Sequence, residues 1–234
     1  MEDIRAITLD LDDTLWPIEP VIETAENRLY EWLSANCPGI TPSHTIETMR
    51  AARLEIVRTH TQIAHDVTEV RRRSLHRILV VEGGYPDGYV DQAMEEFLIH
   101  RNNVELYPDV LPFLTSARER YPLLSVSNGN ADLHQIGLGD LFVRHVSARD
   151  VGAAKPDARM FQAACEHLGL IPAQVLHIGD HPVQDILGAA RLGMKTVWVN
   201  RNGVQWDEGA GADHEVSSLE RVLDLLPLNK SGVY

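Results

Sequence analysis

The sequence predicts an α/β protein with a mainly parallel sheet flanked by helices, and with an α-helical bundle inserted after the first strand. From about residue 105 onward, short apolar runs alternate with segments of helical periodicity, which is typical of βαβ units. Residues 16–104 show helical periodicity without a convincing strand. We therefore expect a core formed by residues 1–15 and 105–234, and a helical domain formed by residues 16–104.

The predicted core begins with a buried strand at Ile4–Leu9. Later apolar runs predict further strands at Leu123–Val126, Arg144–Ser147, Val175–Ile178 and Thr196–Val199. The helices expected between these strands cover residues 110–120, 133–141, 160–168 and 183–190. Residues 201–212 are rich in glycine and polar side chains, so we expect a surface loop before a last strand–helix pair that ends near Leu226.

The inserted segment contains apolar stripes at the spacing of amphipathic helices. These stripes run through Ile22–Leu33, Ile46–Val57, Val67–Leu79 and Val90–Leu98, and turn residues such as Gly83-Gly84 separate them. Such a pattern predicts a small helical bundle. The basic run Arg71–Arg73 falls in the third stripe, and we expect it to form a solvated face.

The composition disfavours some classes of partner. A net charge of −13 disfavours non-specific binding to nucleic acid or to an anionic membrane surface. Cys37 and Cys165 lie far apart in the sequence and form no C-x-x-C pattern. We therefore expect both to be reduced thiols. Neither a basic leader nor an apolar run of about 18 residues is present. We expect a cytoplasmic monomer or homodimer.

Polar residues follow three of the predicted strands at the points where those strands end. The three groups are Asp10-Leu11-Asp12-Asp13-Thr14, Ser127-Asn128-Gly129-Asn130, and Gly179-Asp180 with Asp185. In open parallel sheets, ligands bind beyond the carboxyl ends of the strands. We therefore expect these groups to converge although they lie far apart in the sequence.

The carboxylates in these groups favour a metal site. Asp10 and Asp12 are two residues apart and would share one face of an extended segment, whereas Asp13 would point away from them and is expected to be a bystander. Asp180 and Asp185 add two more carboxylates, and a set of oxygen ligands suits Mg²⁺.

The same groups offer partners for a phosphoryl group. Ser127 supplies a hydroxyl, the backbone at Asn128-Gly129 can donate N–H groups, and Lys155 in a loop can bring a positive charge. One aspartate could then attack phosphorus to form an aspartyl-phosphate. A second could protonate the leaving oxygen and later activate water.

At these residues the sequence resembles the haloacid dehalogenase (HAD) superfamily. The four motifs of that superfamily occur in order: Asp10-x-Asp12-x-Thr14, Ser127 after an apolar strand, Lys155-Pro156, and Gly179-Asp180 followed by Asp185. The resemblance spans the whole chain and implies a Rossmann-like core with a helical cap. It also implies an Mg²⁺-dependent phosphatase acting on a small phosphorylated metabolite.

The resemblance assigns roles to individual residues. Asp10 would be the nucleophile and Asp12 the general acid/base. Mg²⁺ would be held by the Asp10 side chain, the Asp12 carbonyl and Asp180, with Asp185 close by or acting through water. The implied substrate-binding residues are Ser127, Asn128, Thr14 and Lys155, and Lys155 would also offset the negative charge.

Two other functions remain open at this point. The superfamily contains metal-independent 2-haloacid dehalogenases, which differ at the second carboxylate position, and Asp12 therefore favours a phosphatase. A non-catalytic binding protein with the same fold is the other alternative. More narrowly, Asp-Leu-Asp-Asp-Thr-Leu-Trp followed by a Pro-Val-Ile helix is similar to bacterial phosphatases that act on FMN and on phosphoribitylamino-pyrimidines of riboflavin synthesis. Specificity would then lie in residues 16–104.

Overall fold

The sheet of the protein is parallel throughout its described pairs. The structure, a computed structural model, describes residues 1, 3–207 and 211–226. Its strands are β1 (Ala6–Leu9), β2 (Leu123–Ser127), β3 (Arg144–Ser147), β4 (Val175–Gly179), β5 (Lys195–Val199) and β6 (His214–Val216). Among the described residues they form one six-stranded sheet in the order β3-β2-β1-β4-β5-β6. The predicted α/β class and its strands are confirmed.

Strand β1 lies in the interior of the sheet, between β2 and β4, and Thr8 is the one polar residue in it. All four of its residues are buried, as expected for a strand covered by helices on both sides. It pairs with β2, where Leu9 lies opposite Ser125, and with β4, where Leu9 lies opposite Ile178. The three strands that end in polar groups are therefore neighbours, and their carboxyl ends lie at one edge of the sheet.

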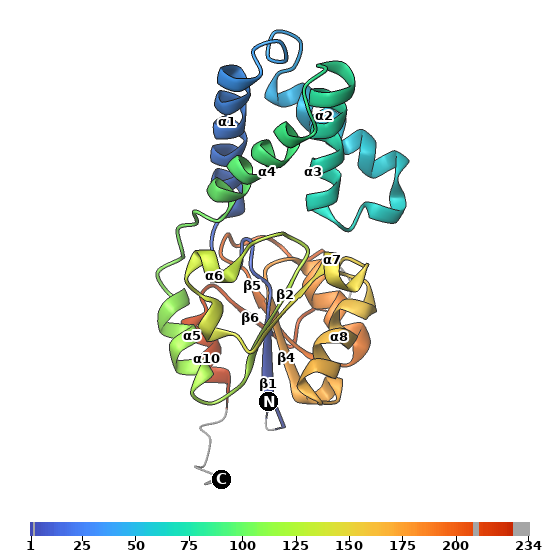
Figure 1. Cartoon of the computed structure of the whole chain (residues 1–234). Helices are drawn as coiled ribbons and strands as arrows, with labels where there is room; N and C mark the ends of the chain where they lie inside the picture. Colours follow the sequence, from blue (N-terminus) through green and yellow to red (C-terminus); the bar gives the residue numbers. More distant parts are fainter. Residues whose placement is uncertain (2, 208–210, 227–234) are drawn as a thin grey trace. The chain divides into compact units, whose positions relative to one another are not determined.

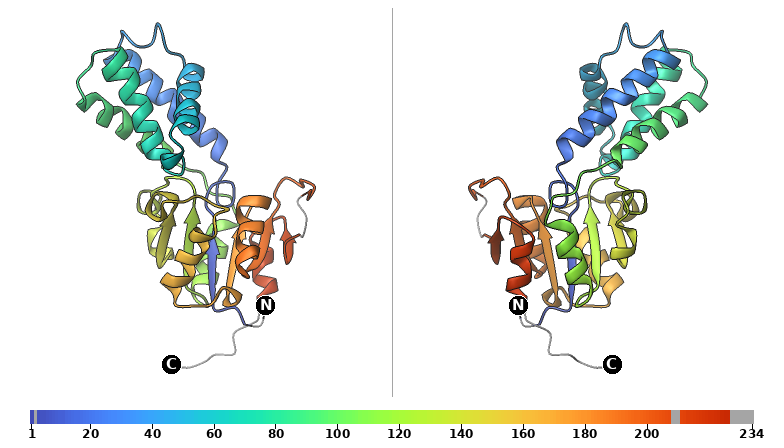
Figure 2. Two further views of the ribbon diagram at one scale, coloured as in Figure 1. Left: turned by 90° about the vertical axis from the view of Figure 1, so that its right-hand side faces the viewer. Right: turned by 90° about the vertical axis from the view of Figure 1, so that its left-hand side faces the viewer.

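Helices cover both faces of this sheet, as Figures 1 and 2 show. One face carries α5 (Val110–Arg118) and α10 (Glu220–Leu225), and the other carries α8 (Ala158–Leu168) and α9 (Gly188–Leu192). Phe161 and Met160 of α8 pack with Val126 and Val175 of the sheet in one buried cluster. This packing fixes the loop before α8, which contains Lys155.

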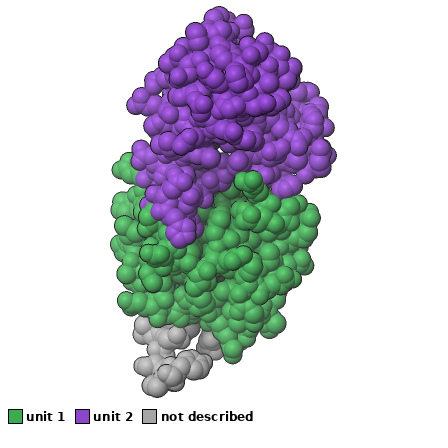
Figure 3. Space-filling model, viewed as in Figure 1, with its two compact units in different colours: residues 1–17, 105–129, 137–234 green, residues 18–104, 130–136 purple. Residues whose placement is uncertain are grey.

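The chain divides into two compact units, which Figure 3 distinguishes by colour. Unit 1 consists of residues 1–17, 105–129 and 137–234, and unit 2 consists of residues 18–104 and 130–136. Unit 2 contains α1 (Ile18–Asn36), α2 (Ile46–Thr59), α3 (Val67–His76), α4 (Gly88–Arg101) and the short α6 (Leu133–Ile136). The role of this helical unit as a cap stays a prediction.

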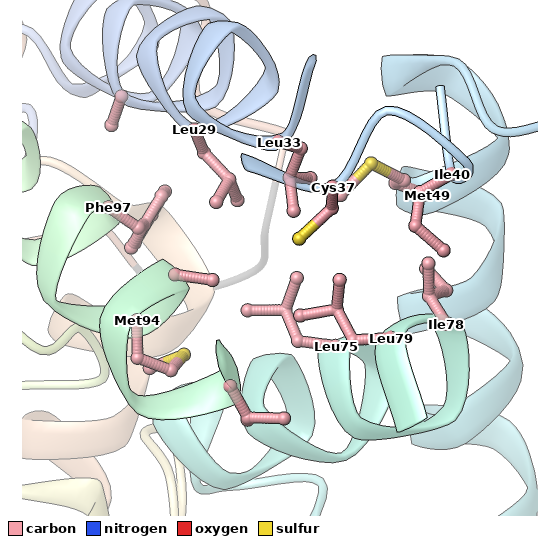
Figure 4. Packing of buried hydrophobic residues seen from close by; sticks show 13 residues of the cluster. Leu29, Leu33, Cys37, Ile40, Met49, Leu75, Ile78, Leu79, Met94 and Phe97 are labelled. Carbon is pink, nitrogen blue, oxygen red and sulfur yellow. The ribbon is translucent and has the colours of Figure 1, made fainter. Parts of the chain in front are cut away.

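Unit 2 has its own apolar core. Leu29 and Leu33 of α1 belong to the same buried cluster as Leu75 of α3 and Phe97 of α4 (Figure 4). Apolar residues recurring every three or four positions supply this core, as the helical periodicity predicted. No helix within the described residues is long and apolar enough to cross a membrane.

The basic run Arg71–Arg73 is not uniformly solvated, so that prediction is wrong for Arg71. Arg71 is 8% exposed, and its guanidinium lies 3.5 Å above the centre of the Phe97 ring and 3.5 Å from Glu26. Arg72 and Arg73 are exposed, as expected. The helical stripe places Arg71 on the apolar face of α3, where an aromatic ring and a buried carboxylate accommodate its charge.

Three helices differ locally from their predicted form. The expected helix at 183–190 is a π-helical turn at Pro182–Leu187 followed by α9, and the stretch 133–141 is α6 plus a 3₁₀ turn at Gly139–Leu141. The third stripe of unit 2 continues beyond α3 as a π-helical turn at Arg77–Glu82. Apolar periodicity locates a helix but does not distinguish such turns from α-helix.

Candidate active site

Three carboxylates converge beyond the ends of β1 and β4. Asp10 directly follows β1, and its N–H donates to the Ile178 carbonyl at 2.9 Å, so the sheet ladder fixes its backbone. Asp180 follows β4, and Asp185 lies in the π-helical turn Pro182–Leu187. One ligand oxygen from each of the three lies within 4.8 Å of the others. The expected convergence is therefore present for the ends of β1 and β4.

Lys155 joins two of these carboxylates. Its ammonium group contacts Asp10 Oδ1 and lies 2.6 Å from Asp185 Oδ1, and only 5% of the residue is exposed. The Lys155 N–H donates to Asn128 Oδ1 at 2.7 Å, and Asn128 Nδ2 donates back to the Lys155 carbonyl at 3.1 Å. The end of β2 thus fixes the backbone of the lysine, while the predicted contact of Asn128 with substrate stays a prediction.

Asp185 is held by partners on both of its oxygens. Oδ1 lies near Lys155 and accepts from His177 Nε2 at 3.2 Å, whereas Oδ2 accepts from the N–H of His181 at 3.0 Å. A Cβ at Gly179 would lie 2.6 Å from the Asp185 Cβ, so this glycine is needed for close approach. These contacts fix the Asp185 carboxylate in one orientation.

Sequence reasoning missed His177. It is fully buried in β4, and its Nδ1 lies 2.9 Å from the hydroxyl oxygen of Thr8 in β1. Burial lowers the pKa of His177, and the Asp185 carboxylate opposes this shift. The ring therefore donates from Nε2 to Asp185 while Nδ1 accepts from Thr8. Polar Thr8 and His177 within otherwise apolar strands were the available signal.

The electrostatics of the group show an excess of negative charge. Burial raises the pKa of Asp10 well above its usual range, with repulsion from Asp185 and Asp180 adding to the shift and Lys155 opposing it. Burial, Asp185 and Asp13 together raise the pKa of Asp180 to about 7. When ionised, three carboxylates and one ammonium group carry a net charge of −2.

Asp185 and Lys155 form the charged part of the group. Burial alone would raise the pKa of Asp185, but the charge of Lys155 and the hydrogen bond from His177 outweigh it and hold that pKa well below its usual range. Burial would lower the pKa of Lys155, yet Asp10 and Asp185 raise it above its ordinary value. Both groups are therefore ionised at neutral pH.

Thr14 and Ser127 provide hydroxyls close to the strand ends. The Thr14 hydroxyl lies 3.4 Å from Asp10 Oδ2 and 3.2 Å from Asp180 Oδ1, so its single hydrogen is shared between these carboxylates. Ser127 Oγ accepts from the N–H of Gly129 at 2.9 Å and the residue is buried. The substrate-binding roles predicted for Thr14 and Ser127 stay predictions.

The segment after Asp10 is a tight loop rather than an extended strand. Strand β1 ends at Leu9, and Asp13 has a φ of 62°. The extended backbone that was expected to point Asp13 away from Asp10 and Asp12 is therefore absent. The charge of Asp13 also contributes to the raised pKa of Asp180. The Asp12 side chain lies outside the close carboxylate group found among the described residues, and its Oδ1 accepts from Trp16 Nε1 at 2.9 Å.

The donor set fits a divalent cation. Asp10, Asp180 and Asp185 offer only oxygen ligands, which hard cations such as Mg²⁺ prefer. Burial, with repulsion from Asp185 and Asp13, raises the pKa of Asp180, and the fully ionised group has a net charge of −2, which one divalent cation would neutralise. The predicted contribution of the Asp12 carbonyl is untested.

The lysine-bridged carboxylate group lies beyond the carboxyl ends of parallel strands, which is where open α/β sheets bind their ligands. The family model of haloacid dehalogenase-like hydrolases matches residues 4–193. The chain therefore belongs to the haloacid dehalogenase-like hydrolase family, as the four motifs predicted.

Relatives within this family include both phosphatases and dehalogenases. The chain is 30% identical over 230 residues to 5-amino-6-(5-phospho-D-ribitylamino)uracil phosphatase YigB of Escherichia coli, covering 95% of this chain and 96% of that protein. It is 34% identical over 158 residues to phosphoserine phosphatase of Thermus thermophilus, covering 65% of this chain and 63% of that protein. A crystal structure of 2-haloacid dehalogenase from Pseudomonas syringae pv. Tomato DC3000 matches with a TM-score of 0.90 and 33% identity over 95% of this chain and 97% of that one.

Proposed function

We propose that the chain is an Mg²⁺-dependent phosphomonoester hydrolase that forms an aspartyl-phosphate on Asp10. The observation that carries this proposal is the buried group of Asp10, Asp180 and Asp185, which Lys155 bridges and which has a net charge of −2 when all three carboxylates are ionised. A phosphoryl group adds further negative charge, so hydrolysis of a phosphate ester at this point requires a cation. The charge of the site therefore supports metal-dependent phosphoryl transfer.

The metal would be held by Asp10, Asp180 and the Asp12 carbonyl, with Asp185 beside it. Bound there, Mg²⁺ would offset the charge of the carboxylates and of the phosphoryl oxygens. This neutralisation would also lower the pKa of Asp10 and Asp180, because a nearby positive charge favours the ionised form. Asp10 would then be ionised, as a carboxylate nucleophile must be.

The chain's own residues would carry the reaction in two steps. Lys155 contacts Asp10 Oδ1, so it can hold the nucleophile and bind a phosphoryl oxygen. Asp10 attacks phosphorus, the bond to the leaving oxygen breaks, and Asp12 gives that oxygen a proton. In the second step Asp12 takes a proton from water as the water attacks phosphorus, which releases phosphate and restores Asp10. Ser127 and the backbone N–H groups after it would bind the remaining oxygens.

For the substrate, we propose a small phosphorylated metabolite. The full-length similarity to the E. coli phosphatase supports a riboflavin-pathway phosphate or FMN as the first candidate to test. The similarity to a phosphoserine phosphatase supports including small phosphorylated amino acids and sugars in the same screen.

A 2-haloacid dehalogenase is the second candidate function, because the match to the Pseudomonas syringae structure covers almost the whole chain. Asp12 argues against it, since the dehalogenases of the superfamily differ at this position. Release of halide from 2-haloacids without metal, together with no turnover of phosphate esters, would favour the dehalogenase.

The proposed function is tested with p-nitrophenyl phosphate and Mg²⁺. We expect turnover that EDTA stops and that Asp10→Asn abolishes, because the amide is not a nucleophile. Asp224→Asn removes an exposed carboxylate from α10 and serves as the matched control. Turnover by Asp10→Asn equal to wild type would rule out Asp10 as nucleophile. Failure to turn over a broad panel of phosphate esters would favour the non-catalytic alternative.

A further inference from the structure

Trp16 contacts the carboxylate of Asp12 directly. Its indole Nε1 donates a hydrogen bond to Asp12 Oδ1 at 2.9 Å, and the ring is fully buried. Trp16 is one residue from the end of the first segment of unit 1, and none of the four superfamily motifs includes it. A buried indole N–H normally finds an acceptor, and here that acceptor is the carboxylate of the proposed general acid.

The backbone holds both ends of this hydrogen bond. Asp12 and Trp16 form an isolated β-bridge, and the N–H of Asp13 donates to the Trp16 carbonyl at 2.7 Å. The N–H of Leu15 donates to the Leu11 carbonyl at 2.8 Å. Asp13 adopts the left-handed conformation that closes the loop. The indole is therefore fixed relative to Asp12 by the loop itself.

This contact makes the two oxygens of the Asp12 carboxyl group inequivalent. An indole N–H is a donor only and cannot accept. When Asp12 is protonated, a proton on Oδ1 would make that oxygen a weaker acceptor for the indole N–H, so the hydrogen bond favours the proton on Oδ2. The hydrogen bond also restricts rotation of the Asp12 carboxyl group about its Cβ–Cγ bond, which helps to hold Oδ2 in one orientation.

We propose that Trp16 is a positioning residue for general acid catalysis: its indole N–H fixes Asp12 so that Oδ2 gives the proton to the leaving oxygen. This inference rests on the proposed phosphatase function and on Asp12 as its acid. In the first step, the bond between phosphorus and the leaving oxygen breaks and the Oδ2 proton moves to that oxygen. In the second step, Oδ2 takes a proton from the attacking water.

The expected consequence is a dependence on the leaving group. Proton donation matters most for an alkoxide, which is a poor leaving group, and little for p-nitrophenolate, which leaves without help. The value of kcat/KM reports the steps up to loss of the leaving group. Trp16→Phe should therefore lower kcat/KM for an alkyl phosphate such as glycerol 3-phosphate by about tenfold or more, within the range of general acid catalysis. The change for p-nitrophenyl phosphate should stay within about twofold.

Two controls separate positioning from packing. Trp32→Phe makes the same substitution in unit 2, and its kcat/KM values for the two esters should keep the wild-type ratio. The benzothienyl analogue of tryptophan, incorporated at position 16, keeps the size of the ring and lacks the N–H, so it tests the hydrogen bond even where Trp16→Phe folds poorly. In ¹⁵N-resolved NMR spectra, the Trp16 indole proton should move upfield in Asp12→Ala as its acceptor is lost.

The outcomes are distinguishable. An equal loss with both substrates, no loss with either, or an unmoved indole resonance in Asp12→Ala would overturn the role of Trp16 while leaving the phosphatase intact. A wild-type protein that hydrolyses neither ester with Mg²⁺ would overturn the proposed function and the role of Trp16 with it. Selective loss with the alkyl phosphate would establish the positioning role.

Discussion

Replacing Asp180 by asparagine should make the metal-free protein more stable and at the same time abolish its response to Mg²⁺. The substitution removes one negative charge and keeps the shape of the side chain. The Thr14 hydroxyl, which lies 3.2 Å from Asp180 Oδ1, can still donate to the amide oxygen of the variant. The main change is therefore the loss of repulsion from Asp185 and of the energetic cost of burying the Asp180 charge.

The size of the effect follows from the pKa of Asp180. Burial and neighbouring carboxylates raise this pKa from 3.8 to about 7 in the folded protein. Below pH 3.8 the group is protonated in both states and contributes nothing. As pH rises from 3.8 to 7, the unfolded chain loses the proton first, so the free energy of unfolding falls. At about 1.4 kcal/mol per pKa unit, the loss above pH 7 is about 4 kcal/mol.

Urea unfolding in EDTA, followed from pH 4 to pH 8.5, measures this effect. The gain in stability of Asp180→Asn over wild type should grow with pH and reach up to about 4 kcal/mol near pH 8. Adding Mg²⁺ should stabilise wild type at pH 8, by about 2.7 kcal/mol at 100 times its dissociation constant, and should not stabilise the variant. Asp224→Asn, on the surface of α10, is the control.

A variant no more stable than wild type at pH 8 would refute the reasoning. So would a difference between the two proteins that does not change with pH, because the raised pKa of Asp180 requires this dependence. Equal stabilisation of both proteins by Mg²⁺ would remove Asp180 from the set of proposed metal ligands.

Three further substitutions test the contacts around this group. Lys155→Met leaves Asp10 and Asp185 buried without the ammonium group that pairs with them. The free energy of unfolding in urea at pH 7 should therefore fall by about 3–5 kcal/mol. A variant as stable as wild type would contradict the proposed charge balance of the site. Gly179→Ala forces a Cβ against Asp185 and should lower the free energy of unfolding by about 1–3 kcal/mol. It should also raise the Mg²⁺ concentration needed for activity. An unchanged melting temperature would argue against close packing at this position. His177→Phe removes the donor to Asp185 Oδ1 and should lower the free energy of unfolding by about 1–3 kcal/mol. His177→Gln can keep an N–H donor and should lower it by less. Equal effects of the two substitutions would show that the hydrogen bond is unimportant for stability.

The sheet and the positions of the carboxylates could be predicted because both follow from local sequence. An apolar run that ends in carboxylates predicts a buried strand and a polar strand end, and parallel strands bring such ends to one edge. Asp10 and Asp180 were found in this way, and Lys155 by its place in a loop between Ala154 and Pro156. Their roles in the reaction remain proposals.

Contacts that depend on three-dimensional packing could not be predicted. His177 lies between Leu176 and Ile178 in an apolar strand, and only the pairing of β1 with β4 brings Thr8 beside it. Arg71 is distinguished from Arg72 only by the side of α3 on which it falls. The left-handed turn at Asp13 is a backbone conformation that its sequence neighbours permit but do not require.

The contacts of the three carboxylates divide their proposed roles. Both oxygens of Asp185 are engaged, Oδ1 by Lys155 and His177 and Oδ2 by the N–H of His181, and Lys155 and His177 hold its pKa low. Asp180 receives the Thr14 hydroxyl on Oδ1, and its raised pKa indicates that its charge is poorly compensated. A divalent cation gains most where negative charge is least satisfied. We therefore infer that Asp10 and Asp180 would bind the metal directly, while Asp185 would hold Lys155 in place and act on the metal through water.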